Sequence, residues 1–298
     1  PVDKILISGS PFLLFRIGYT ATKKYSIPWI ADYRDGWTTD AYPEAVGILT
    51  KPIHLFNKYF EKKWVSSAAA FTTVSGHLKK GIEKYTGVKG SVVYNGFFAE
   101  KDIPKATTVN RTGIRFLYSG VMYPRQDYRT PVTVFKKIID RYKDQIDIEF
   151  VFLGTVYADE AFKNDPIFKG YEDTILLTER VNYKAALEIH GSADIFLMFT
   201  HQGMKGIVSS KLFDYIKFHK PVLLFPGDGD ILDELLLRSG LGIIVNDAVV
   251  LEKKLAYLIE QKMETGFIES HPDIEYINSF NRENQAGTLA EVIKANFA

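Results

Sequence analysis

The chain has 298 residues, of which 46% are hydrophobic and 24% charged, and its formal net charge is +1. This composition is typical of a globular protein long enough for two domains, and it lacks the basic field of nucleic-acid-binding proteins. The absence of cysteine excludes disulfides, thiol catalysis and cysteine-ligated metal. No apolar run approaches the ~20 residues that a membrane-spanning helix needs.

Short apolar segments typical of strands alternate along the chain with amphipathic segments typical of helices. The expected strands cover 5–8, 29–32, 71–74, 91–94, 115–119, 147–153, 174–177, 195–199, 222–225 and 242–245. The expected helices cover 12–24, 51–69, 75–85, 130–142, 183–192, a segment starting at 211, 232–238, 249–261 and 275–297. This alternation predicts parallel, doubly wound α/β sheets, which bind ligands at the carboxyl ends of their strands.

The turn-forming pair Asn95-Gly96, followed by a polar stretch that contains proline, marks a domain boundary. We expect a first domain over 1–97, a second over 98–270 and a C-terminal helical segment over 271–298. The chain begins almost directly with a strand of the buried type, and such a strand needs neighbours and covered faces. We therefore expect that the start of the first domain is missing.

The segment GMKGIVSSKLFDYIKFHKP, residues 203–221, is the most informative part of the sequence. Small residues lead into a helix of about three turns, with Lys211 in its first turn and Asp214 three residues later. A helix N-terminus and a lysine attract phosphate, and a carboxylate on the same face can hold hydroxyl groups. Phosphate and hydroxyl groups together indicate a sugar nucleotide, although a capped surface helix between two strands explains the same pattern.

This segment resembles the K-L-F-E-Y and K-P-V-L elements of retaining glycosyltransferases of family four. Here the elements read Lys211-Leu-Phe-Asp214-Tyr and Lys220-Pro-Val-Leu. The family usually has glutamate at the position of Asp214, and a second acidic residue where this chain has Gly206. The resemblance implies an α/β protein with two Rossmann-like doubly wound domains (the GT-B architecture), the first truncated at its N-terminus. It also implies a final helix that packs back toward the first domain.

The strand 115–119 leads to Gly120 and then to Arg125. A glycine after a strand lets the backbone approach a ligand, and an arginine fork matches phosphate oxygens. By resemblance, Gly120, Arg125 and Lys211 hold the donor diphosphate, with Arg129 as a competing candidate. A solvated loop arginine is the alternative interpretation of Arg125.

Three further residues receive donor roles, two of them from the resemblance. The family's loops after two later strands flank the nucleotide base, which places Gly154 and Val181 near the base of a UDP- or GDP-linked donor. An ordinary turn glycine is the alternative for Gly154. His201 follows the strand 195–199, and we expect it to contact the donor sugar together with Asp214.

A dense polar cluster, Asp32, Arg34, Asp35 and Trp37, follows the strand 29–32. The family subset has a similar D-x-R-D-x-W on its acceptor side. We expect Asp32, Arg34 and Trp37 to bind the acceptor and Asp35 to act as the catalytic base. The alternative is an Arg–Asp pair that fixes the loop, with Trp37 packed on it.

The helix 51–69 carries Phe56, Tyr59, Phe60 and Trp64 on one side and lysines mostly elsewhere. This pattern is typical of a core-facing helix, and it also fits a helix that lies on an anionic membrane surface. No spacing of histidines indicates a metal site, so we expect neither metal nor cofactor.

The sequence therefore predicts a retaining, metal-independent glycosyltransferase of the hexosyltransferase type, active in polysaccharide or glycoconjugate synthesis. Its substrates would be a nucleotide-sugar donor and a saccharide or lipid-linked acceptor, with no nucleic-acid partner. We expect it in the cytoplasm, with peripheral contact to the inner face of the membrane. The alternatives are a sugar-nucleotide 2-epimerase of the same fold and a catalytically degenerate GT-B binding protein.

Overall fold

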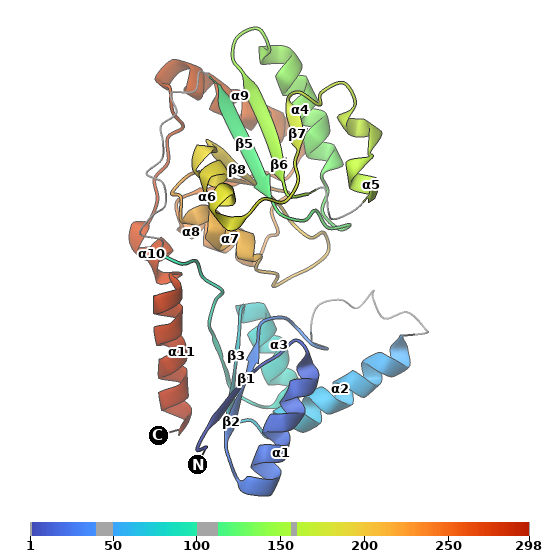
Figure 1. Ribbon diagram of the computed structural model, residues 1–298, viewed down its shortest axis with the longest axis vertical. Helices are drawn as coiled ribbons and strands as arrows, with labels where there is room; N and C mark the ends of the chain where they lie inside the picture. The colour runs from blue at the N-terminus through green and yellow to red at the C-terminus, as the bar shows by residue number, and fades with distance from the viewer. Residues whose placement is uncertain (1, 40–49, 100–112, 156–159, 298) are drawn as a thin grey trace. The chain divides into compact units, whose positions relative to one another are not determined.

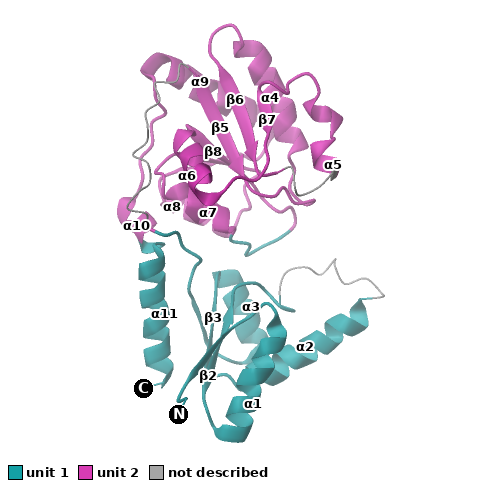
Figure 2. Ribbon diagram, in the orientation of Figure 1, with its two compact units in different colours: residues 1–98, 204–208, 279–298 teal, residues 99–203, 209–278 magenta. Residues whose placement is uncertain are grey.

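The computed structural model of the chain describes residues 2–39, 50–99, 113–155 and 160–297 (Figure 1). The chain divides into two compact units (Figure 2). Unit 1 comprises residues 1–98, 204–208 and 279–298, and unit 2 comprises residues 99–203 and 209–278. Each unit is built around its own parallel β-sheet.

Unit 1 contains a four-stranded sheet with the order β1-β2-β3-β4. Its strands are β1 (Ile5–Ser8), β2 (Trp29–Tyr33), β3 (Ala70–Thr73) and β4 (Gly90–Val92). Its helices are the short 3₁₀ helix Phe12–Leu14, α1 (Phe15–Tyr25), α2 (Lys51–Val65), α3 (Gly76–Thr86) and α11 (Arg282–Phe297).

The two faces of this sheet are covered by different helices. Consecutive residues of a strand point to opposite faces. Trp29, Ala31 and Tyr33 of β2 belong to an aromatic-rich core that also takes in residues of α1, α2 and α3. Ile30 packs instead with Val292 of α11, which lies beside the sheet in Figure 1. Strands from the start of the chain and a helix from its end therefore share one apolar layer.

A short parallel bridge between Phe97 and Asn281 fixes the start of α11. The Phe97 N–H donates to the Phe280 carbonyl at 3.1 Å, and the Arg282 N–H donates to the Phe97 carbonyl at 2.9 Å. Gly96 permits this approach, because a Cβ there would lie 2.2 Å from the Phe280 carbonyl oxygen. The pairing also explains why the helix predicted over 275–297 is interrupted in the structure.

Unit 2 contains a six-stranded parallel sheet with the order β10-β9-β8-β5-β6-β7. Its strands are β5 (Ile114–Ser119), β6 (Ile148–Leu153), β7 (Ile175–Leu177), β8 (Ile195–Phe199), β9 (Val222–Phe225) and β10 (Gly242–Ile244). Its helices are α4 (Arg129–Tyr142), α5 (Glu160–Lys163), the 3₁₀ helix Pro166–Phe168, α6 (Tyr183–Ser192), α7 (Ser210–Ile216), α8 (Ile231–Arg238), α9 (Ala248–Thr265) and most of α10 (Ile274–Ser279).

Alternation along β8 shows how the second sheet is covered. Ile195, Leu197 and Phe199 belong to the large core that contains residues of α4 and α9. Phe196 points to the other face, where its ring stacks on Tyr215 of α7 at 4.4 Å. Both faces of this sheet are thus buried under helices, as a parallel sheet requires.

The predicted strands are present, with ends that differ from the prediction by at most two residues. The helix predicted from Lys211 is shorter than three turns, because α7 ends at Ile216. His219 has a left-handed φ of 56°, and Lys220 precedes a proline, so the backbone leaves the helical region there. The helix predicted over 51–69 likewise ends early, at Val65.

Candidate functional site

Unit 2 has a topological switch point between β5 and β8. The sheet grows from β5 through β6 to β7 on one side and from β8 through β9 to β10 on the other. Ligands of open parallel sheets bind outside the carboxyl ends of the strands at such a point, because the neighbouring loops diverge there. Gly120 and Arg125 follow β5, and His201 and Lys211 follow β8. The fold therefore places these four predicted donor-site residues at one edge.

Backbone pairing holds the loops after β5 and β8 together. Gln126 and His201 form an isolated antiparallel bridge. The Gln202 N–H donates to the Arg125 carbonyl at 3.0 Å. The side-chain amide of Gln126 is buried and donates to the Phe199 carbonyl at 2.7 Å. These bonds fix the backbone of Arg125 next to that of His201.

Lys211 reaches from α7 to the end of β5. Its Nζ donates to the Val121 carbonyl at 2.9 Å and to the Tyr118 hydroxyl, and it lies 4.1 Å from the centre of the Tyr118 ring. Gly120 has a φ of 94°, and a Cβ there would lie 3.0 Å from Lys211 Cε. Among the described residues, no carboxylate pairs with this ammonium group.

The charge of this edge is positive and poorly solvated. Burial lowers the pKa of Lys211 from 10.5 to about 7. Burial also lowers the pKa of His201, and the positive charges of Lys211 and Arg125 add to that decrease. The positive charges of Lys211 and Arg125 therefore repel a proton on His201, and an anion bound among the three groups would favour their charged forms.

Tyr215, one turn after Lys211, fastens α7 to the same strand end. Its fully buried hydroxyl accepts the N–H of Ser119 at 2.7 Å. Because α7 has only seven residues, the site depends on its side-chain cations more than on the helix dipole that the sequence suggested. Tyr118 and Tyr215 were not predicted as site residues, since both look like ordinary apolar positions in the sequence.

Asp214 lies on the same helix as Lys211 but does not pair with it. Its carboxylate is half-exposed, and its Oδ1 lies 3.6 Å from the Nζ of Lys217. Lys217 itself is buried at the end of α7. The sequence offered no indication of this partner, because Lys217 reads as a solvent-facing lysine.

The two expected base-flanking positions lie beside each other. The Gly154 N–H donates to the Thr178 carbonyl at 3.0 Å. Gly154 has a φ of 74°, and a Cβ there would lie 3.5 Å from Cγ of Arg180. Val181 follows at once and is exposed. A left-handed glycine and an exposed loop thus border the carboxyl end of β6.

Arg129, the competing phosphate candidate, is already paired with a buried carboxylate. Its guanidinium lies 2.7 Å from Oδ2 of Asp165. The Tyr128 hydroxyl donates to the same oxygen at 2.6 Å. Arg129 is therefore committed to the α4 end of the fold.

In unit 1, Asp32 is a buried structural centre. Its carboxylate accepts hydrogen bonds from the Ser8 hydroxyl at 2.6 Å, the Thr72 hydroxyl at 2.7 Å and Arg34 Nε at 2.9 Å. Arg34 also donates to the Val93 carbonyl at 3.3 Å. These bonds join the ends of four neighbouring segments, so the geometry favours the loop-fixing alternative for Asp32 and Arg34.

Trp37 packs into the aromatic core, where its ring stacks on Phe12 at 5.2 Å. Asp35 is exposed, and in the part of the chain that the structure describes its carboxylate has no hydrogen-bond partner. The loop is anchored by Glu61 of α2, a buried residue that sequence reasoning missed. Glu61 accepts the Thr38 N–H at 3.1 Å, and burial raises the pKa of its carboxyl group.

Gly206, which replaces the second acidic residue of the resembling pattern, lies in unit 1. Its φ is 73°, and a Cβ there would lie 2.7 Å from Cβ of His77. A glutamate would need both a strained backbone and a displaced histidine at this position. The missing acidic group therefore has a local steric reason.

The aromatic side of α2 divides between core and surface. Trp64 is buried, and Phe60 packs against the same core. Phe56 and Tyr59 are exposed, together with Ile53. No described helix is long and apolar enough to cross a membrane.

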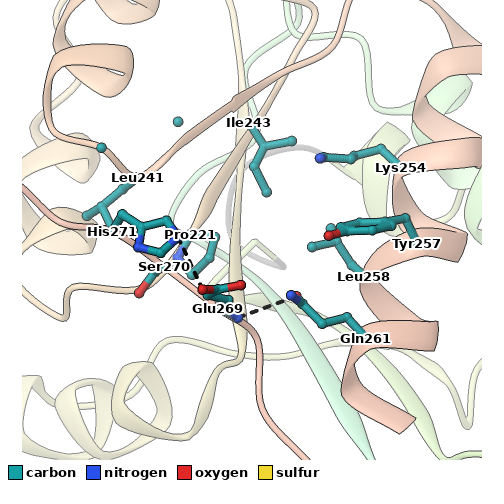
Figure 3. Close-up of a pocket in the computed structure, with 12 residues that line it drawn as sticks. Pro221, Leu241, Ile243, Lys254, Tyr257, Leu258, Gln261, Glu269, Ser270 and His271 are labelled. Carbon is teal, nitrogen blue, oxygen red and sulfur yellow. Dashed lines mark hydrogen bonds and ion pairs between the residues drawn. The ribbon is translucent and has the colours of Figure 1, made fainter. Parts of the chain in front are cut away.

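A cavity of about 220 Å³ lies at the amino ends of β9 and β10, away from the switch point (Figure 3). Lys254 and Tyr257 border it from α9. Glu269 and His271, whose side chains lie 3.3 Å apart, border it from the following loop. Within the described ranges, no group of three histidine or acidic residues could hold a metal ion.

Comparison with known proteins finds similarity of structure only. No protein-family model matches the chain, and no curated protein matches its sequence. Sucrose-phosphate synthase of Thermosynechococcus elongatus superposes with a TM-score of 0.67 at 13% identity, over 99% of this chain and 74% of that one. HepE of Anabaena, solved in complex with UDP-glucose, gives 0.67 at 14% identity, over 97% of this chain and 78% of that one.

A third similar structure belongs to a different class of enzyme. A Listeria monocytogenes protein described as a UDP-N-acetylglucosamine 2-epimerase superposes with a TM-score of 0.57 at 11% identity, over 99% of this chain and 74% of that one. Such identities indicate a shared fold. The chain therefore has the GT-B fold of two Rossmann-like α/β units, which confirms the fold predicted from its sequence.

Proposed function

We propose that this protein binds a nucleotide sugar in unit 2 and transfers the sugar to a saccharide or lipid-linked acceptor. One observation carries the proposal: among the described residues, the ammonium group of Lys211 has no carboxylate partner and lies beside Gly120 at the switch point. Removing an ammonium group from water is costly unless an anion compensates it. Arg125 adds a fork that suits phosphate oxygens.

These two cations match the change of charge during glycosyl transfer. In glycosyl transfer from a nucleotide sugar, negative charge develops on the departing nucleoside diphosphate. Lys211 and Arg125 would stabilise that charge in a site from which water is partly excluded. HepE, which has the same fold, has been solved with UDP-glucose, and this supports a UDP-sugar as the donor class.

We propose finer roles for the other residues in line with the resemblance. Asp214 and His201 would hold the donor sugar, and Gly154 and Val181 would border the nucleotide base. On unit 1, the exposed carboxylate of Asp35 is our candidate for the acceptor side and for the catalytic base, within a loop that Asp32, Arg34 and Trp37 hold in place. We propose that the transfer retains stereochemistry, in line with the resemblance described above.

The phosphate-site assignment is tested by calorimetric titration of UDP-glucose into three variants. Lys211→Ala and Arg125→Ala should each weaken binding about tenfold to a hundredfold, because a charge-assisted hydrogen bond contributes roughly 1.5–3 kcal/mol. Lys253→Ala, which removes an exposed lysine of α9, is the matched control and should bind normally. Unchanged affinity in both site variants would remove the assignment. A parallel screen of UDP-, GDP- and ADP-sugars would name the donor class.

We also propose that the enzyme works without a metal ion, because the two cations can carry the charge that a divalent ion would otherwise neutralise. Activity should survive treatment with EDTA. Activity that is lost with EDTA and restored by Mn²⁺ or Mg²⁺ would overturn this part of the proposal.

We also propose that the protein is cytoplasmic and that unit 1 makes peripheral contact with the inner face of the membrane. The exposed Ile53, Phe56 and Tyr59 of α2 lie on a helix that also carries exposed lysines, which suits an anionic lipid surface. Phe56→Ser should reduce sedimentation with phosphatidylglycerol vesicles but not the weak sedimentation with phosphatidylcholine vesicles. Phe267→Ser, at an equally exposed phenylalanine of unit 2, should have no effect.

The main rival function is that of a sugar-nucleotide 2-epimerase. The similar Listeria protein, described as a UDP-N-acetylglucosamine 2-epimerase, motivates this alternative. Both functions need the same diphosphate site, so binding data do not separate them. Incubation with UDP-N-acetylglucosamine and analysis of the sugar by NMR does: an epimerised sugar nucleotide supports the rival. A protein that binds the donor and yields neither an epimer nor a transferred sugar with any acceptor would be a degenerate binding protein.

A further inference from the structure

Tyr123, in the loop after β5, is an exposed aromatic residue at the switch point to which the proposed function gives no role. The residue is 49% exposed. Its ring centre lies 5.3 Å from that of His201, with the two ring planes inclined at 47°, and 5.9 Å from the Nζ of Lys211. The Tyr123 ring therefore lies beside both the proposed phosphate ligand and a proposed ligand of the donor sugar.

Main-chain hydrogen bonds fix the position of this residue. The Tyr123 N–H donates to the side-chain oxygen of Gln126 at 2.9 Å, and the Gln126 N–H donates to the Tyr123 carbonyl at 2.9 Å. Gln126 is buried and forms the bridge to His201. None of these bonds uses the side chain of Tyr123, so the loop does not need a tyrosine at this position in order to fold.

The exposed ring gives this charged edge an apolar surface. Ligand sites combine aromatic side chains with a few polar groups, and here the polar groups are the cations of Lys211 and Arg125 and the imidazole of His201. A hexose carries hydroxyl groups around its edge and C–H groups on its faces. One face of a hexose can therefore pack on an aromatic ring, which removes apolar surface of both partners from water.

The strand order indicates which half of a nucleotide sugar meets the Tyr123 ring. β5 lies between β6 and β8 in the sheet. Gly154, the proposed neighbour of the base, follows β6, whereas His201 follows β8. A diphosphate held by Lys211 at the end of β5 would have its base on the β6 side and its sugar on the β8 side. The contact with His201 places the Tyr123 ring on the β8 side.

We propose that Tyr123 is a specificity-determining residue, whose ring packs against a C–H face of the donor hexose. This inference rests on the proposed function and deepens it. Lys211 and Arg125 would hold the diphosphate, while Tyr123 and His201 would form an aromatic shelf for the sugar attached to it. Loss of the ring should therefore weaken binding of the nucleotide sugar and spare the nucleotide.

The ring contact is tested by calorimetric titration of UDP-glucose and UDP into separate samples of each variant. In Tyr123→Ala, affinity for UDP-glucose should fall about threefold to tenfold, the range expected for one aromatic contact. Affinity for UDP should stay within about twofold, because Lys211 keeps its contacts with the Tyr118 ring and the Val121 carbonyl. Tyr123→Phe keeps the ring and should bind both probes as the wild type does.

Tyr257→Ala is the matched control. Tyr257 is 55% exposed, lies on α9 of the same unit and borders the cavity away from the switch point (Figure 3). Its loss should leave the ratio of the two affinities unchanged.

A second measurement uses the wild-type protein and does not depend on the folding of Tyr123→Ala. NMR spectra of protein with isotope-labelled tyrosine rings report on each tyrosine, and the signal missing in Tyr123→Phe identifies Tyr123. UDP-glucose should shift this signal further than UDP does, because the sugar lies against the ring. Equal shifts with the two probes would overturn the sugar contact.

The titrations have equally definite outcomes. Equal losses of affinity for UDP and UDP-glucose in Tyr123→Ala, or no loss for either, would overturn the proposed role of the ring. A loss of the same size in Tyr123→Phe would also overturn it, because the contact would then belong to the hydroxyl group. Wild-type protein that binds neither probe would instead refute the proposed function itself.

Discussion

At the scale of single residues, Lys211 is distinctive because it is both the proposed phosphate ligand and a group with a strongly perturbed proton affinity. Burial lowers its pKa from 10.5 to about 7. The perturbation follows from its surroundings, which offer a carbonyl, a hydroxyl and an aromatic ring but, among the described residues, no anion. Perturbed ionisable groups of this kind often mark functional sites.

We predict that UDP binding takes up protons at neutral pH. At about pH 7.5 much of the free protein carries a neutral Lys211, and a bound diphosphate favours the ammonium form and raises the pKa. Affinity should therefore fall as the pH rises from about 7 to about 9. Calorimetry in buffers of different ionisation enthalpy should show an uptake that approaches one proton per UDP.

The assignment of this proton to Lys211 has its own control. His201 also has a lowered pKa, so His201→Gln should keep the uptake above pH 7. Lys211→Met should abolish the proton uptake, although this variant should still bind UDP weakly. Uptake of the same size in Lys211→Met would mean that another group takes the proton.

The sequence placed Gly120, Arg125 and His201 after strand ends and Lys211 at a helix start, and the structure brings the loops after β5 and β8 together. The roles of these residues stay predictions. The burial of Lys217 was missed because it depends on Tyr183 of α6, which meets the end of α7 only after folding. Residue type alone does not distinguish a buried lysine from a solvated one.

At the scale of elements, the strands were predictable because a parallel strand is a short apolar run bounded by turn residues. Helix ends were less predictable. The end of α7 depends on a non-glycine residue, His219, in a left-handed conformation, which only a few per cent of non-glycine residues adopt. The break between α10 and α11 depends on pairing with Phe97, which lies far away in the sequence.

That pairing allows a direct test. We predict that Gly96→Ala destabilises the attachment of α11, because a Cβ would lie 2.2 Å from the Phe280 carbonyl oxygen. Hydrogen exchange of the Phe97 and Arg282 amides should become faster, since both bonds belong to this junction. Gly76→Ala is the matched control, because a Cβ there meets no atom within 4 Å. Unchanged exchange in Gly96→Ala would contradict the geometry.

At the scale of the whole molecule, the two units differ in how completely their apolar surfaces are covered. Unit 1 has four strands, and its exposed apolar side chains include Leu6, Leu13 and Ile17. Unit 2 has six strands and a larger buried core. The last helix, α11, and residues 204–208 are grouped with unit 1.

We predict that unit 1 opens more readily than unit 2. Less apolar burial gives less stabilisation, so amides of β1–β4 should exchange faster than those of β5, β6 and β8. Addition of UDP should slow exchange in unit 2 more than in unit 1, because a ligand stabilises the unit that binds it. Equal exchange rates in both sheets would contradict the prediction.

The packing of Val292 against Ile30 and Ala70 also bears on the order in which the protein matures during synthesis. A ribosome delivers the strands of unit 1 first, then all of unit 2, and only afterwards the helix that covers the outer face of the first sheet. Domains usually fold as their sequence emerges. Here the unit whose strands are translated before unit 2 would be completed after it, so its uncovered sheet face would be a natural substrate for chaperones until α11 arrives.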